Sequence, residues 1–166
     1  MQNQPSKRNR ISSLAIVEDD SRVREYLAQH IRERVDVDEL YEFSNAEDAL
    51  QALSVNPPEM ALFDIQLPGM TGIECIRKLK LLHPRIQVMI LTVFDNSDTV
   101  FEALKAGASS YILKNTSPEK LAESIYELHE GGSPISSQIA RKVIEAFQVK
   151  STSNEHFRSL SRREQE

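Results

Sequence analysis

Cysteine is nearly absent from this 166-residue sequence, which contains only Cys75. A disulfide within the chain is therefore excluded, and a single thiol does not make a cluster of thiolate metal ligands. The four histidines fall in no spacing that is typical of metal ligands. These absences exclude the disulfide-stabilised and the zinc-cluster classes of small protein.

Long apolar runs are also missing. The first ten residues are polar and basic, and the short apolar run after them is broken at once by Glu18, Asp19 and Asp20. Such a run is too short for a signal peptide and far too short for a membrane span. We therefore expect a cytoplasmic protein that makes no contact with a membrane.

An excess of basic residues is lacking as well. Twenty lysines and arginines stand against 25 acids, for a net charge of -5, so DNA binding would require a local basic patch. The hydrophobic share of 40% and the charged share of 27% are ordinary for a globular domain. The length suits one domain with a buried core and an appendage.

The sequence does contain a regular alternation of short apolar runs with stretches of helical periodicity. This pattern predicts five buried strands that alternate strictly with five helices. Alternation with short loops is typical of a doubly wound α/β fold, a parallel sheet covered by helices on both faces. The expected strands are 14–17, 37–43, 60–63, 88–91 and 111–113, and the expected helices are 21–34, 45–55, 72–82, 98–105 and 117–130.

Polar side chains follow the predicted strands where those strands end. Because the carboxyl ends of parallel strands meet at one edge of a sheet, we expect these side chains to converge. Several carboxylates there would repel one another unless a cation joined them, and Mg²⁺ with oxygen ligands is suitable. A carboxylate nucleophile, a metal, an ammonium and a hydroxyl can together hold a phosphoryl group during transfer. The residues are Glu18, Asp19 and Asp20 after the first strand, Asp64 after the third, Thr92 at the fourth and Lys114 after the fifth.

Four segments at these positions, IVEDD, LFDIQLPGMTGIE, ILTVFD and YILKN, resemble the CheY-like receiver domains of response regulators. Each segment alone is a weak signal, but the ordered set is specific and covers residues 11–130. The resemblance implies a flavodoxin-like (βα)5 fold with the strand order 2-1-3-4-5. It implies that the domain is a phosphoacceptor switch with Mg²⁺ as cofactor, and not an enzyme beyond slow self-dephosphorylation.

The resemblance also implies residue roles. Asp64 would accept the phosphoryl group, Thr92 and Lys114 would hold phosphate oxygens, and Thr92 with Tyr111 would form the switch. The implied Mg²⁺ ligands are Asp19 directly, Glu18 through water or hydrogen bonds, Asp64, and the backbone carbonyl of Gln66.

Some of these residues have simpler explanations. Asp20 is explained equally well as a cap of the following helix and as a metal ligand. Tyr111 could be an ordinary core residue. Val93 stands where the family often has a small residue, which is expected to narrow access to the phosphate.

The implied function is a two-component response regulator that a sensor histidine kinase phosphorylates. On phosphorylation Thr92 would move towards the phosphate, Tyr111 would turn inward, and the face formed by the fourth helix, fifth strand and fifth helix would change and allow homodimerisation. Two alternatives stay open. A phosphatase of the haloacid-dehalogenase type needs a second aspartate where Gln66 stands, and a pseudo-receiver interaction module would not need the complete acidic set.

The C-terminal region resembles the NarL/FixJ group of LuxR-type transcription regulators. We predict a disordered leader at 1–10, the receiver at 11–130, and a linker at 131–159 that contains a short helix over 138–147. The last residues, SLSRREQE, resemble the start of a LuxR-type helix-turn-helix, so 160–166 would begin a domain whose remainder is missing. DNA binding and transcription regulation would then belong to the full-length protein.

Overall fold

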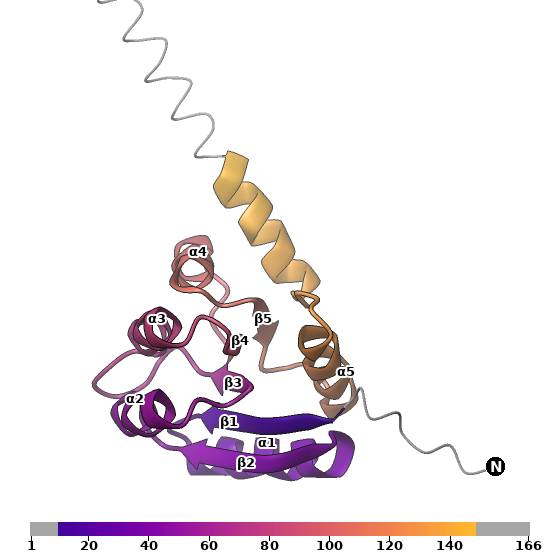
Figure 1. The fold of residues 1–166 in the computed structure, drawn as a ribbon. Helices are drawn as coiled ribbons and strands as arrows, with labels where there is room; N and C mark the ends of the chain where they lie inside the picture. Colours follow the sequence, from indigo (N-terminus) through magenta and orange to yellow (C-terminus); the bar gives the residue numbers. More distant parts are fainter. Residues whose placement is uncertain (1–9, 149–166) are drawn as a thin grey trace, which may run out of the picture.

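A sheet of five parallel strands forms the centre of the structure, a computed structural model that describes residues 10–148 (Figure 1). The strand order is β2-β1-β3-β4-β5, and every neighbouring pair is parallel, which confirms the predicted topology. The strands are β1 (Ile11–Val17), β2 (Val37–Phe43), β3 (Met60–Phe63), β4 (Gln87–Thr92) and β5 (Ser110–Leu113).

Five labelled helices alternate with the strands, as the periodicity predicts. They are α1 (Ser21–Arg34), α2 (Ala46–Val55), α3 (Gly72–Leu82), α4 (Ser97–Ala106) and α5 (Pro118–His129). Each begins after a residue whose side chain accepts a backbone amide of the first turn, and α4 ends at Gly107 with a left-handed φ of 117°. Most bounds lie within a residue or two of the predictions, but β1 begins at Ile11 rather than Leu14.

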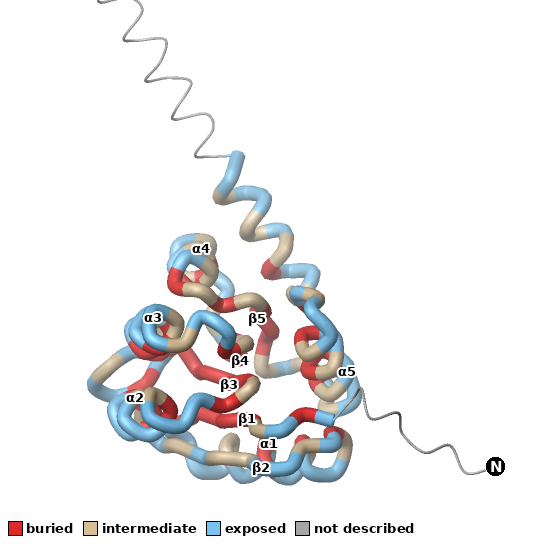
Figure 2. Tube along the Cα trace, viewed as in Figure 1, coloured by how far each residue is buried: buried red, intermediate tan, exposed pale blue. Residues whose placement is uncertain are grey.

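The helices cover both faces of the sheet because side chains of a strand point alternately to opposite sides. In β1, Ala15 and Val17 belong to a cluster with α2, α3 and α4, whereas Leu14 and Ile16 belong to a cluster with α1 and α5. Buried segments accordingly run through the middle of the molecule, between exposed outer faces of the helices (Figure 2). The sheet is therefore a rigid platform that fixes the positions of the loops at its ends.

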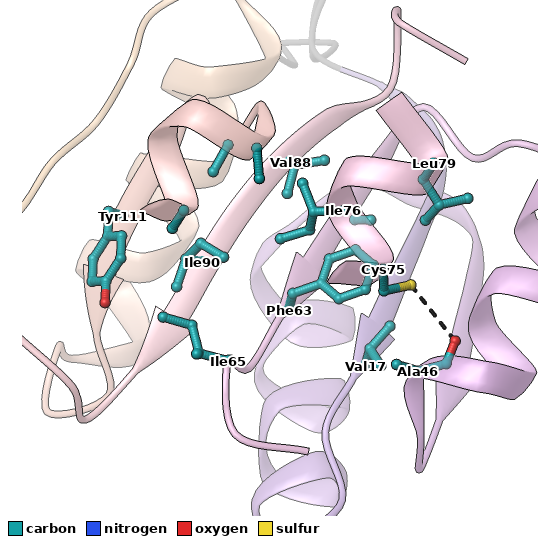
Figure 3. Close-up of a cluster of buried hydrophobic side chains, with 14 of the residues drawn as sticks. Val17, Ala46, Phe63, Ile65, Cys75, Ile76, Leu79, Val88, Ile90 and Tyr111 are labelled. Atoms are coloured by element: carbon teal, nitrogen blue, oxygen red, sulfur yellow. Dashed lines mark hydrogen bonds between the residues drawn. The ribbon is translucent and has the colours of Figure 1, made fainter. Parts of the chain in front are cut away.

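Cys75 lies in the core between α2 and α3, so its thiol is not at the surface. Its side chain is fully buried, and its Sγ lies 3.6 Å from the carbonyl oxygen of Ala46 (Figure 3). Burial raises the pKa of the Cys75 thiol to about 12. The raised pKa makes the thiol inert at neutral pH.

The chain beyond α5 departs from the sequence prediction at one point. The sequence predicts only a short helix within the linker at 131–159, but Ile135 in this linker also makes a parallel bridge to Tyr111 on the outer edge of β5. The predicted C-terminal helix is present and is helical from 137 through 148, where the described residues stop. A pairing of this kind depends on a distant strand, so local sequence patterns carry no signal for it.

Two predicted segments lie outside the described residues: the leader, apart from Arg10, and the start of a helix-turn-helix at 160–166. The linker is described only as far as residue 148. Within 10–148, every helix is too short or too polar to traverse a bilayer.

Candidate functional site

The carboxyl ends of β1, β3 and β5 bring two acids and a lysine into direct contact. Lys114 Nζ lies 2.8 Å from Glu18 Oε2 and donates a hydrogen bond of 3.0 Å to Asp64 Oδ2. The side chains of Glu18 and Asp64 are almost fully buried, with 3% and 8% of their surface exposed. The predicted convergence of Glu18, Asp64 and Lys114 is therefore present.

The backbone fixes these three residues because the hydrogen-bond ladder of the sheet continues beyond the strand ends. The amide of Asp64 donates to the carbonyl of Val17, and the amide of Lys114 donates to the carbonyl of Thr92, at 3.0 and 2.9 Å. The amide of Glu18 donates to β2 in the same way. The Asp64 carboxylate is further oriented because its Oδ1 accepts the Ile65 amide at 2.8 Å.

Three carboxylates meet in this pocket. Glu18, Asp19 and Asp64 each offer an oxygen within 4.8 Å of the others, and Asp19 is exposed whereas the other two are buried. Oxygen-only ligands of this kind are those that Mg²⁺ prefers. The acidic cluster is thus consistent with the metal site of a receiver domain.

The pKa values of Glu18 and Lys114 reflect their burial and the charges around them. Burial raises the pKa of the Glu18 carboxyl above its ordinary value, and the charge of Asp64 adds to the rise, although Lys114 acts against it. Burial would lower the pKa of Lys114, but hydrogen bonds and charges from Glu18 and Asp64 outweigh it and hold that pKa above its ordinary value. Lys114 is therefore a permanent cation among more carboxylates than it can neutralise.

Asp20, the acid with two competing explanations, caps α1. Its Oδ1 accepts the amides of Arg22 and Val23 at 2.9 and 3.3 Å. The carboxylate is therefore engaged by the helix, and its position agrees with the capping explanation. Gln66, two residues beyond Asp64, has an exposed side chain.

Thr92 and Tyr111 meet through the loop that follows β4. The buried Thr92 accepts the amide of Phe94 at its hydroxyl, at 3.4 Å. Tyr111 is fully buried beside Ile90 (Figure 3), and its hydroxyl donates to the carbonyl of Phe94 at 2.7 Å. Burial and the nearby Asp95 and Asp64 raise the pKa of Tyr111 well above its usual range, so the phenol stays protonated and can donate. Val93, which stands between Thr92 and Phe94 in the chain, is two-thirds exposed.

Gly72 is a residue of this edge that the sequence analysis missed. A Cβ added to Gly72 would lie only 2.1 Å from the carbonyl oxygen of Asp64, and its amide donates to the carbonyl of Ile65 at 3.0 Å. Only glycine lets the start of α3 approach the loop that carries Asp64 so closely. A glycine in the first turn of a helix, just after the Thr71 cap, was the available signal.

Residues 14–126 match the response regulator receiver domain family, and this match covers most of the chain. The chain belongs to this family. Receiver domains are phosphoacceptors rather than enzymes, so the match gives the phosphatase alternative no support.

Known proteins agree with this membership. The transcriptional regulatory protein YxjL of Bacillus subtilis is 32% identical over 138 residues, which are 82% of this chain and 63% of YxjL. VraR of Staphylococcus epidermidis is 28% identical over 150 residues, which are 90% of this chain and 70% of VraR. The chain spans less than two thirds of the length of YxjL.

Solved structures of LuxR-family response regulators share the fold. One from Aurantimonas sp. SI85-9A1 superposes with a TM-score of 0.76 at 27% identity, covering 82% of this chain and 97% of that one. One from Staphylococcus aureus superposes with a TM-score of 0.68 at 31% identity, covering 72% and 99%. The receiver is thus related to those of LuxR-family regulators.

Proposed function

We propose that this receiver is phosphorylated on Asp64 by a sensor histidine kinase, with Mg²⁺ bound, and that it regulates transcription through the full-length protein. The observation that carries the proposal is the buried contact of Lys114 with Asp64 and Glu18, in a chain of the receiver family. A buried carboxylate that is oriented by a backbone amide and a lysine is suited to nucleophilic attack on phosphorus.

The protein groups divide the chemistry as follows. Asp64 forms the new oxygen–phosphorus bond while the donor keeps the electron pair of the bond that breaks. Lys114, already 3.0 Å from Asp64, balances charge on a phosphoryl oxygen, and the Thr92 hydroxyl donates to another. The burial of Asp64 and Thr92 lowers the local dielectric and strengthens both interactions.

Mg²⁺ fits the donor set because three carboxylates carry more charge than Lys114 neutralises. Asp19, Asp64 and the backbone carbonyl of Gln66 are the proposed direct ligands, and Glu18 would act through water or hydrogen bonds. When bound, the ion supplies the positive charge that offsets the acids and stabilises the phosphoryl group.

We propose that phosphorylation draws Thr92 and the loop after β4 towards the phosphate and promotes a homodimer. Because Tyr111 is already buried in this structure, phosphorylation would stabilise its inward position rather than create it. Residues 11–130 would act as the receiver and 131–159 as the linker. DNA binding would belong to a further domain, since relatives such as YxjL are transcriptional regulators longer than this chain.

Mass spectrometry after incubation with acetyl phosphate and Mg²⁺ tests the proposal. We expect one added phosphoryl group per chain, none in Asp64→Asn, and an undiminished level in Asp38→Asn, an aspartate distant from the pocket on the edge strand β2. A chelator of Mg²⁺ should abolish labelling, and a size measurement with and without phosphorylation tests dimerisation. Persistent labelling of Asp64→Asn would show that another residue is the acceptor, and an unlabelled wild-type chain would favour the pseudo-receiver alternative.

A further inference from the structure

The outer edge of β5 is occupied by the chain's own C-terminal segment. We call residues 133–148 the strap. The strap follows α5, pairs with β5 through Ile135 and continues as a helix that passes beside α4 (Figure 1). The Tyr111 amide donates to the carbonyl of Pro134 at 3.3 Å, and the Ser136 amide donates to the carbonyl of Tyr111 at 3.2 Å. Both backbone groups of Tyr111 are therefore engaged by the strap.

Apolar side chains hold the strap in place. Ile139 is fully buried in the cluster that contains Tyr111, and Val143 packs against the same cluster. Farther along, the ring of Phe147 meets the ring of Phe101 in α4 edge to face, with centroids 6.5 Å apart. Ile144, on the same helix, is 58% exposed, so the helix has one docked face and one free face.

Tyr111 also connects the strap to the phosphoryl pocket. Its hydroxyl donates to the carbonyl of Phe94, whose own amide donates to the hydroxyl of Thr92. A continuous set of contacts thus leads from the strap through Tyr111 and the loop after β4 to Thr92. Loss of the strap would uncover Tyr111 and leave its backbone groups to solvent, which weakens the buried position of the ring.

We propose that docking of the strap on β5 and α4 is positively coupled to phosphoryl binding at Asp64, with Tyr111 as the shared element. This inference rests on the proposed function of Asp64. The docked strap stabilises the buried Tyr111, and a phosphoryl group stabilises the same arrangement through Thr92. Because coupling between two sites is reciprocal, each event strengthens the other by the same factor. The strap therefore reports the state of the pocket to whatever follows it in the chain.

A matched pair of isoleucine variants on one helix tests the coupling in the whole chain. Ile139→Ala removes a buried anchor, and Ile144→Ala removes a similar volume from the free face. Beryllofluoride with Mg²⁺ serves as the phosphoryl mimic, and its dissociation constant is measured by NMR titration. Amide hydrogen exchange at Ser136 measures strap docking.

We expect Ile139→Ala to speed exchange at Ser136 and to weaken beryllofluoride binding about fivefold or more, while Ile144→Ala changes neither. In the wild-type chain, beryllofluoride should slow exchange at Ser136. Ser136→Ala, which removes the hydroxyl that accepts the Leu113 amide, should shift both readouts in the same direction by less and serves if Ile139→Ala does not fold.

Equal beryllofluoride affinity in Ile139→Ala and wild type, despite faster exchange at Ser136, would overturn the coupling and leave the proposed function intact. Tighter binding by Ile139→Ala would reverse its sign and overturn it as well. Absence of beryllofluoride binding by the wild-type chain would instead count against the proposed function itself, and the coupling would fall with it.

Discussion

Each end of the sheet holds a carboxylate beside a basic side chain. The two ends differ in how the negative charge of the carboxylate is compensated. At the amino end, Glu59 Oε2 accepts the amide and the hydroxyl of Ser12 at 2.8 and 2.9 Å, and Oε1 lies 2.6 Å from His129 Nε2. Burial would raise the pKa of Glu59, but these partners outweigh it and hold that pKa below its ordinary value.

At the carboxyl end the same kinds of group leave charge unsatisfied. Glu18, Asp19 and Asp64 lie together, Lys114 contacts Glu18 and Asp64, and burial raises the pKa of Glu18 although Lys114 is only 2.8 Å away. Glu59 is stabilised as an anion by its partners, so this contact contributes to the stability of the fold. A cluster of buried carboxylates with one lysine among them is instead consistent with the metal site of a receiver domain.

Gly72→Ala should have the largest effect, because it disrupts the site at the carboxyl end of the sheet. The new methyl would overlap the carbonyl oxygen of Asp64, so α3 or the Asp64 loop must shift, at a cost of about 2–3 kcal/mol in the free energy of unfolding. Labelling by acetyl phosphate should fall with it. Gly131→Ala is the control for labelling: its φ of 98° costs about 1–3 kcal/mol of strain, but its methyl would meet nothing within 4 Å, so labelling should not change. Urea unfolding measures both, and a Gly72→Ala chain with wild-type stability and labelling would contradict the close approach.

Glu59→Gln should weaken the amino end without affecting the pocket. Because the pKa of folded Glu59 is lowered, its ionised form contributes stability above its unfolded pKa, and this contribution is lost as pH falls through the folded pKa. With about a third of the side chain exposed, we expect a loss of about 0.5–1 kcal/mol at pH 7 that disappears in acid. Thermal unfolding at several pH values measures it, with the exposed Glu130→Gln as control. A loss that is equally large in acid would rule out an electrostatic origin.

Asp19→Asn should change the free energy of unfolding least, and should raise it where the other two variants lower it. Removing one charge from three repelling carboxylates should raise stability without Mg²⁺ by about 0.5 kcal/mol, as expected for like charges about 5 Å apart at a solvent-exposed position. Added Mg²⁺ should then stabilise this variant less than the wild type, because a proposed direct ligand is gone. Unfolding with and without Mg²⁺ measures both terms, and the contrast between the two ends fails if Asp19→Asn is destabilising in the absence of metal.

The strand ends illustrate how much the sequence could predict. Apolar runs that stop at Glu18, Asp64 and Lys114 already imply a shared edge, because parallel strands all present the same end there. Asp20 could not be decided in this way, since one aspartate after a strand suits both a cap and a ligand. The capping bonds to Arg22 and Val23 become visible only in the folded loop.

The sequence by itself determined the alternation of elements, the parallel sheet and the set of acids with their lysine, because periodicity and strand polarity are local properties, whereas the strand order came from the family resemblance. Only the tertiary structure decided that Tyr111 donates to Phe94, that 133–136 pairs with β5, and that Gly72 must be glycine. Those contacts join segments far apart in the chain. Their energies depend on which surfaces packing brings together, and no local pattern encodes that.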